Sequence, residues 1–128
     1  MIRVVIADDH AIVRRGLRRI LAEETDMTVV AEAADAQELL AFVREQPCDL
    51  VVTDISMPGR SGLHALKELK RECPTLPVLV LSVLPEEEYG ALALKLGASG
   101  YLTKKTAPEE LVKAIRKAVT AGRPPAYL

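Results

Sequence analysis

The stretches IRVVIADD, residues 2–9, and LVVTD, residues 50–54, decide the fold. Each is a short apolar run rich in β-branched residues, which is the pattern of a buried strand. Asp8 and Asp9 close the first run, and Asp54 closes the second. If the two strands are parallel neighbours, the three carboxylates meet at one edge of a sheet, because the carboxyl ends of parallel strands lie together. There they could hold a divalent cation and expose one oxygen as a nucleophile.

The rest of the chain alternates β-branched runs with longer stretches of helical period, which predicts βα units and a parallel sheet. Five strands are expected, at Arg3–Ala7, Thr28–Ala33, Leu50–Asp54, Val78–Ser82 and Gly100–Thr103. Five helices are also expected, of which the first begins after Asp9. The second includes Ala36–Val43 and stops before Pro47, and the third runs from Ser61 and stops before Pro74. The fourth spans Glu86–Leu96, and the fifth begins at Pro108. The predicted fold class is therefore α/β, a single (βα)₅ doubly wound domain with helices on both faces of the sheet.

Composition fits one compact domain and argues against several other classes. The chain has 128 residues, of which 49% are apolar, so it can bury a sizeable core. Its net charge of -1 gives no strong field toward nucleic acid or anionic lipid. Neither a signal-like segment nor an apolar run of membrane length is present, and we expect a soluble, cytoplasmic protein. Cys48 and Cys73 lack metal-ligand spacing and are predicted to be free thiols.

Polar groups follow four of the five expected strands, since Ser82 ends the fourth and Lys104 follows the fifth. A single aspartate in such a place is usually a helix N-cap, and Asp9 could serve that way. Three carboxylates brought together repel one another unless positive charge compensates them. Lys104 supplies one charge, and Mg²⁺, which prefers oxygen ligands and keeps positions open for phosphate oxygens, would supply the rest.

The chemistry that this group of side chains indicates is phosphoryl transfer. An aspartate carboxylate can act as a covalent nucleophile, and such transfer depends on in-line positioning and neutralised phosphoryl oxygens. Asp54 is the candidate nucleophile, because it ends a central strand before a turn. Asp9, helped by Asp8 through water, would hold the metal. Lys104 would pair with the phosphoryl group, and the Ser82 hydroxyl could donate to it.

Two groups of residues near the acidic pair have open interpretations. His10 could be imagined as a ligand, yet a solvated or capping residue is the expected role at the entry to a helix. The arginines at 14, 15, 18 and 19 form either a docking face for an acidic partner or a solvated helix face.

Farther along, the fourth helix is expected to bury Tyr89, Leu92, Ala93 and Leu96 and to end at Gly97, a suitable left-handed cap.

Taken in order, DD at 8–9, DISMPG at 54–59, LS at 81–82 and GYLTKK at 100–105 resemble the receiver domain of bacterial two-component response regulators. The segments ADDHAIVRRGL and GASGYLTKKTAPEELVKAI are most similar to the NarL/FixJ (LuxR-type) subfamily, whose members usually join a receiver to a helix-turn-helix DNA-binding domain. The chemotaxis member of the family has the flavodoxin-like strand order 2-1-3-4-5, so the resemblance implies a three-layer fold of that order. It also implies a receiver domain at residues 1–121 and, at 122–128, the start of a linker toward a DNA-binding domain.

The resemblance assigns roles to individual residues. It makes Asp54 the phosphoacceptor, Asp8 and Asp9 the acidic pocket, and the backbone carbonyl of Ser56 a further ligand to Mg²⁺. Ser82 and Tyr101 match the hydroxyl and aromatic switch residues of the family, and Lys104 matches its phosphate-binding lysine.

The chain departs from the family pattern at two positions. Lys105 stands where many receivers have a proline joined by a cis peptide, so the Lys104–Lys105 peptide is either a strained cis bond or trans. Val83 follows Ser82 where alanine is common. Its branched side chain is expected to narrow the access of water and small phosphodonors to the phosphoryl group.

The function implied by the resemblance is a phosphorylation-dependent switch, which promotes only its own phosphorylation and dephosphorylation and is not an enzyme for an external substrate. A sensor histidine kinase would be its partner, phosphorylation would favour a homodimer, and DNA would be reached only through a further domain. One rival is a Mg²⁺-dependent phosphohydrolase, although position 56 is Ser where a general acid is needed and no cap insertion is long enough. The other is an unphosphorylated interaction module, whose usual mark would be loss of an acidic residue or the lysine.

Overall fold

The computed structural model describes residues 1–55, 62–82 and 86–121. In this part of the chain, five parallel strands form one sheet in the order β2-β1-β3-β4-β5. The strands are β1 (Ile2–Ala7), β2 (Met27–Ala33), β3 (Leu50–Thr53), β4 (Val78–Ser82) and β5 (Gly100–Thr103). The helices are α1 (Ala11–Ala22), α2 (Ala36–Glu45), α3 (Gly62–Glu72), α4 (Glu86–Lys95) and α5 (Ala107–Ala121). The α/β class and the strand order implied by the resemblance are confirmed.

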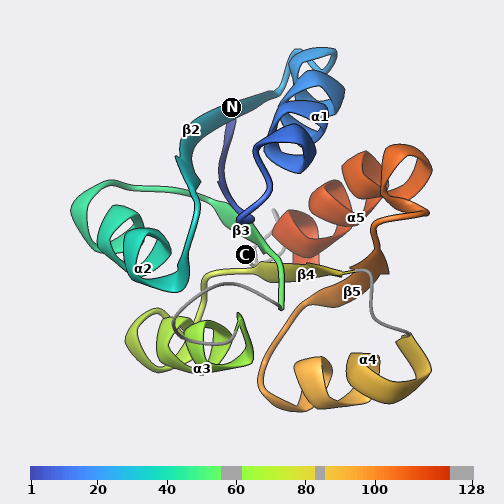
Figure 1. Cartoon of the computed structure of the whole chain (residues 1–128). Coiled ribbons are helices and arrows are strands. Elements are labelled where there is room, and N and C mark those ends of the chain that lie inside the picture. Colours follow the sequence, from blue (N-terminus) through green and yellow to red (C-terminus); the bar gives the residue numbers. More distant parts are fainter. Residues whose placement is uncertain (56–61, 83–85, 122–128) are drawn as a thin grey trace, which may run out of the picture.

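Helices cover both faces of the sheet, so the domain has three layers (Figure 1). Successive residues of β1 point to opposite faces, as in any strand. Val4 and Ile6 join the core under α1 and α5, whereas Val5 and Ala7 join the core under α2, α3 and α4. Because both faces are covered, the buried runs at residues 4–7, 50–52 and 78–81 are apolar and do not alternate with polar residues.

Backbone hydrogen bonds bring the polar strand ends to one edge of the sheet. The amide of Asp54 donates to the carbonyl of Ala7, at 2.9 Å, so Asp54 leaves the sheet beside Asp8. Between β4 and β5, the amide of Lys104 donates to the carbonyl of Ser82, at 2.8 Å. The parallel register therefore places these residues together before any side-chain contact is considered.

Helix ends largely follow the expected signals. The proline-marked stops are confirmed, because α2 ends before Pro47 and α3 ends before Pro74. Gly97 follows α4 with a φ of 105°, the left-handed conformation expected of that cap. The prediction that Leu92 is buried was wrong, since it is 41% exposed while Ala93 is fully buried. Ala93 belongs to the core under α2, α3 and α4, and Leu96 is partly buried against that core.

Two expectations from composition can also be compared with the structure. Cys48 and Cys73 are free and half-buried, which confirms the prediction of unpaired thiols. Burial raises the pKa of the Cys48 thiol, with a smaller contribution from the nearby Asp49 carboxylate. Of the helices in the described ranges, none combines the length and apolar character needed to cross a membrane.

Candidate functional site

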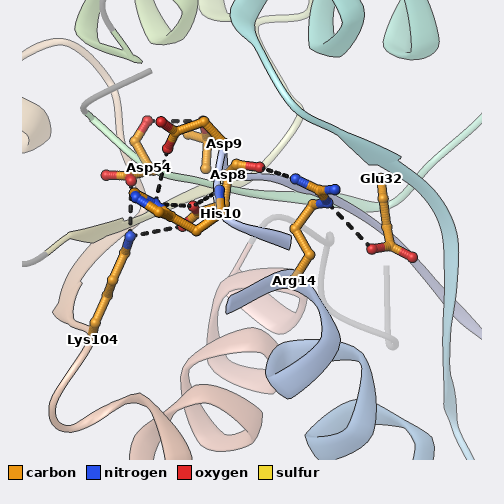
Figure 2. Close-up of polar contacts among 8 residues, drawn as sticks. Asp8, Asp9, His10, Arg14, Glu32, Asp54 and Lys104 are labelled. Carbon is orange, nitrogen blue, oxygen red and sulfur yellow. Dashed lines mark hydrogen bonds and ion pairs between the residues drawn. The ribbon is translucent and has the colours of Figure 1, made fainter. Parts of the chain in front are cut away.

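Three aspartates and a histidine meet at the carboxyl ends of β1 and β3 (Figure 2). One ligand atom from each of Asp8, Asp9, His10 and Asp54 lies within 4.8 Å of the others. The side chains of Asp8 and Asp54 are almost completely removed from water, with residue exposures of 1% and 3%. The sheet edge thus gathers the carboxylates that the sequence predicted to converge there, together with an imidazole.

Lys104 supplies positive charge to this cluster from the end of β5. Its ammonium nitrogen lies 2.8 Å from Asp8 Oδ2 and 2.9 Å from Asp54 Oδ2. Burial alone would lower the pKa of Lys104, but hydrogen bonds to Asp8 and Asp54 outweigh it and raise the pKa above its ordinary value. The lysine reaches both carboxylates although no peptide in the described ranges is cis, so the Lys104–Lys105 bond is trans.

Protein groups engage every polar atom of Asp8. Its amide donates to the carbonyl of Ala33 at 3.0 Å, and its carbonyl accepts from Arg14 Nη1 at 2.6 Å. Its Oδ1 accepts from the amide of His10 at 2.9 Å, while Oδ2 pairs with Lys104. Asp8 is therefore fixed in place and serves to hold other members of the cluster.

Asp9 differs from Asp8 because its Oδ1 is buried and accepts no hydrogen bond. His10 Nδ1 lies 3.1 Å from this oxygen but forms no hydrogen bond with it. A buried carboxylate oxygen without a donor is costly unless a positive charge compensates it. Oxygen ligands from carboxylates are the set that Mg²⁺ prefers. The residues present therefore fit a hard divalent cation, with Asp9 the ligand that most needs one.

Sequence reasoning missed the contacts of His10. It occupies the N-cap position of α1, where Asp9 was one candidate, but its side chain makes no capping hydrogen bond. Its Nδ1 lies 3.1 Å from both Asp8 Oδ1 and Asp9 Oδ1, while the ring is 64% exposed. Its place directly after the acidic pair puts it near the carboxylates, but nothing in the sequence shows that the bend at Asp9 brings the ring over them.

The remaining predicted site residues lie around this cluster or outside the described part. Ser82 is fully buried at the end of β4. Tyr101, on β5, is 7% exposed and belongs to the core under α2, α3 and α4. Ser56 and Val83 lie outside the described residues, so their roles as a carbonyl ligand and as an access residue stay predictions.

Comparisons with known proteins agree with this arrangement. Residues 4–116 match the model of the response regulator receiver domain. The response regulator GacA of Pseudomonas aeruginosa is 40% identical over 123 residues, which cover 96% of this chain and 57% of GacA. A LuxR-family two-component response regulator from Aurantimonas sp. has a TM-score of 0.88 and 37% identity, covering 93% of this chain and 85% of that one. RcsB from Salmonella enterica, bound to promoter rprA in the presence of phosphomimetic BeF3-, has a TM-score of 0.86 and 33% identity, covering 95% and 63%.

The chain spans about half the length of the curated relatives it matches, with shares of 54%, 57% and 56% for the first three. Those relatives are response regulators and transcriptional regulatory proteins. The match to the family model runs from β1 into α5 and so includes all the strand ends that carry the acidic cluster and its lysine. The chain therefore belongs to the receiver domain family of two-component response regulators, with its relatives in the LuxR/NarL group.

Proposed function

We propose that this receiver is a switch in which Asp54 accepts a phosphoryl group from a phosphohistidine of a sensor histidine kinase. One observation carries the proposal: buried Asp54 lies 2.9 Å from the Lys104 ammonium, in one cluster with the unsatisfied Oδ1 of Asp9. A nucleophile, a cation for phosphoryl oxygens and a ligand for a divalent ion are thus supplied within a few ångströms. Phosphorylation-dependent signalling is the general role of receiver domains.

In the proposed transfer, a carboxylate oxygen of Asp54 attacks the phosphorus, and the bond from phosphorus to the imidazole nitrogen breaks. The electron pair of that bond leaves with the imidazole. Lys104 already contacts Asp54, so its ammonium is placed to pair with an oxygen of the phosphoryl group. Mg²⁺, held by Asp9, Asp54 and the carbonyl of Ser56, would neutralise charge on the phosphoryl oxygens. Asp8 keeps Lys104 in position from the other side.

The proposed response involves Ser82 and Tyr101, which lie on neighbouring strands. The Ser82 hydroxyl would move to donate to the phosphoryl group, and the place that it leaves would favour an inward Tyr101. Tyr101 is already buried in this structure. Phosphorylation would therefore increase the population of an arrangement that is accessible before phosphorylation, which is a bias on a two-state element.

The output proposed for the switch lies in a longer protein. Residues 1–121 would be its receiver, and 122–128 would begin a linker to a C-terminal helix-turn-helix domain that binds DNA. Two findings support this: the chain spans about half of its relatives, and the similar RcsB is described as bound to a promoter. Phosphorylation-promoted homodimerisation would connect the receiver to transcription.

Intact-mass measurement after incubation with acetyl phosphate and Mg²⁺ tests the proposed function. Wild type should gain one phosphate-sized adduct, which Asp54→Asn should lack and which chelation of Mg²⁺ should prevent. An adduct that persists in Asp54→Asn would assign the nucleophile elsewhere. No adduct with acetyl phosphate or with a phosphorylated kinase would overturn the switch, and steady turnover of a small phosphate ester would favour a phosphohydrolase.

A further inference from the structure

The arginine cluster of α1 is divided by the fold. Arg15, Arg18 and Arg19 are exposed, and Arg14 is half-buried. Arg14 and Arg18 both reach Glu32 on β2. Arg18 Nη1 lies 2.8 Å from Glu32 Oε2, and Arg14 Nε lies 3.5 Å from Glu32 Oε1. Neither open interpretation of the cluster covers Arg14, because its guanidinium group binds within the domain.

Arg14 makes a second contact that Arg18 does not make. Its Nη1 donates to the backbone carbonyl of Asp8 at 2.6 Å, so Arg14 lies between Asp8 and Glu32 (Figure 2). Its side chain is only 20% exposed, although arginine is usually a surface residue. A charged donor bound to a carbonyl makes a strong and directional hydrogen bond. The peptide that joins Asp8 to Asp9 is therefore oriented by Arg14.

We infer that Arg14 is a positioning residue for the cation site, which acts by holding the Asp8–Asp9 peptide while Glu32 holds Arg14. The orientation of that peptide determines the position of the Asp9 Cα atom and the direction in which its side chain leaves the backbone. Asp9 Oδ1 stays buried and without a hydrogen bond among the other carboxylates, an unfavourable place that a relaxed loop would let it leave. Groups that orient metal ligands commonly matter almost as much as the ligands themselves. The inference rests on the proposed function, because it assumes Mg²⁺ at this site.

Charge and position make opposite predictions for Arg14. As a positive charge close to the cluster, Arg14 repels a divalent cation, so its removal would tighten Mg²⁺ binding. As a positioning group, it keeps Asp9 aimed at the site, so its removal would weaken binding. The sign of the change therefore separates the two effects without any appeal to activity.

Calorimetric titration with Mg²⁺ of wild type, Arg14→Met, Arg14→Lys and Arg18→Met tests the inference. Arg14→Met should raise the dissociation constant by about tenfold, the lower end of the range for groups that orient metal ligands. Arg14→Lys should recover part of the lost Mg²⁺ affinity, because the lysine ammonium can still donate one hydrogen bond but lacks the planar guanidinium of arginine, which can bind two acceptors at once. Arg18→Met is the matched control, since it also loses a contact to Glu32 but none to Asp8, and its dissociation constant should stay within about twofold of wild type on the same reasoning.

Thermal unfolding without Mg²⁺ separates positioning from a purely structural role. A structural role predicts lower unfolding temperatures for Arg14→Met and Arg18→Met alike, with unchanged Mg²⁺ affinity of the folded protein. Unchanged or tighter Mg²⁺ binding by Arg14→Met overturns the inference, and Arg14→Lys gives the same test if Arg14→Met does not fold. Phosphorylation assays with acetyl phosphate and with a phosphorylated kinase keep the two proposals apart. Weaker Mg²⁺ binding with no adduct on wild type from either donor retains the inference and overturns the switch, whereas unchanged binding with a normal adduct does the reverse.

Discussion

At the amino ends of the strands, Arg3 binds Asp49 through Nε and Nη2, at 3.1 Å each, and the side chains are 42% and 27% exposed. At the carboxyl ends, three carboxylates lie in one cluster, and the Lys104 ammonium pairs with the two that are buried, Asp8 and Asp54. The Arg3–Asp49 pair is therefore balanced and partly exposed to water, whereas the carboxyl edge is acidic and mostly buried. Both edges belong to one sheet, so the difference does not come from the fold class.

The ion pair at the amino ends stabilises the domain modestly, whereas the carboxylates at the carboxyl ends destabilise it. Exposed ion pairs usually contribute little to the free energy of unfolding, because water screens them. Buried carboxylates in excess repel one another, and each loses hydration. Such an excess does not stabilise the domain, and its presence at one edge fits the divalent-cation site proposed above.

Replacing Lys104 should have the largest effect, because it removes the only cation that contacts both buried carboxylates in the described part of the chain. Lys104→Met should lower the free energy of unfolding by roughly 3 kcal/mol without Mg²⁺, as expected when one partner of a buried ion pair is lost. Mg²⁺ should restore more stability to this variant than it adds to wild type, since the cation finds less competing positive charge. Urea denaturation with and without Mg²⁺ measures both quantities.

Lys105→Met is the matched control for that experiment, because Lys105 is the adjacent residue and is exposed. Its unfolding free energy should stay near that of wild type in both conditions. An equal loss in both variants, or a loss in Lys104→Met that Mg²⁺ does not reduce, would contradict the view that Lys104 compensates the carboxyl edge.

A matched pair of neutralising substitutions should move stability in opposite directions at the two edges. Asp9→Asn removes one repelling charge from the acidic cluster, and we expect it to raise the free energy of unfolding without Mg²⁺ by about 1 kcal/mol. The same variant should lose most of the stabilisation that Mg²⁺ gives to wild type. Asp49→Asn removes the partner of Arg3 and should lower the unfolding temperature. Thermal unfolding of both variants without Mg²⁺ measures these changes. A lower unfolding temperature for Asp9→Asn would contradict the view that excess negative charge destabilises the carboxyl edge.

The sequence pattern was enough to predict the α/β fold class and the convergence of Asp8, Asp54 and Lys104, whereas the strand order was implied by the family resemblance. Apolar β-branched runs ending in polar residues are the signal of parallel strands, and the position where each run ends determines which side chains converge. Asp8, Asp54 and Lys104 could be predicted to meet for this reason. The contacts of His10 and Arg14 could not, because they depend on the conformation of one loop and on the rotamers of two side chains. Sequence periodicity carries no information about either.

The smallest expected effect is at the amino edge, where Arg116 Nη2 lies 2.6 Å from Glu24 Oε1 and 3.1 Å from Asp26 Oδ1. The hydrogen bond from Arg116 holds the pKa of the Asp26 carboxyl below its ordinary value. A lowered pKa in the folded state means that the pair stabilises the domain above the ordinary pKa and that this contribution is lost as the pH falls through the lowered one. Arg116→Met should therefore return the pKa of Asp26 toward its ordinary value and flatten the acid-induced loss of stability below about pH 4.

Carboxyl titration of Asp26 by NMR measures this change directly. Arg44→Met provides the control, because the Arg44 hydrogen bond lowers the pKa of Glu72 in the same way. That variant should raise the pKa of Glu72 and leave the pKa of Asp26 as it is in wild type. If Arg116→Met left the pKa of Asp26 unchanged, Arg116 and Asp26 would not be electrostatically paired in solution. The contrast between the two edges would then rest on the Arg3–Asp49 pair, which Arg116 does not contact.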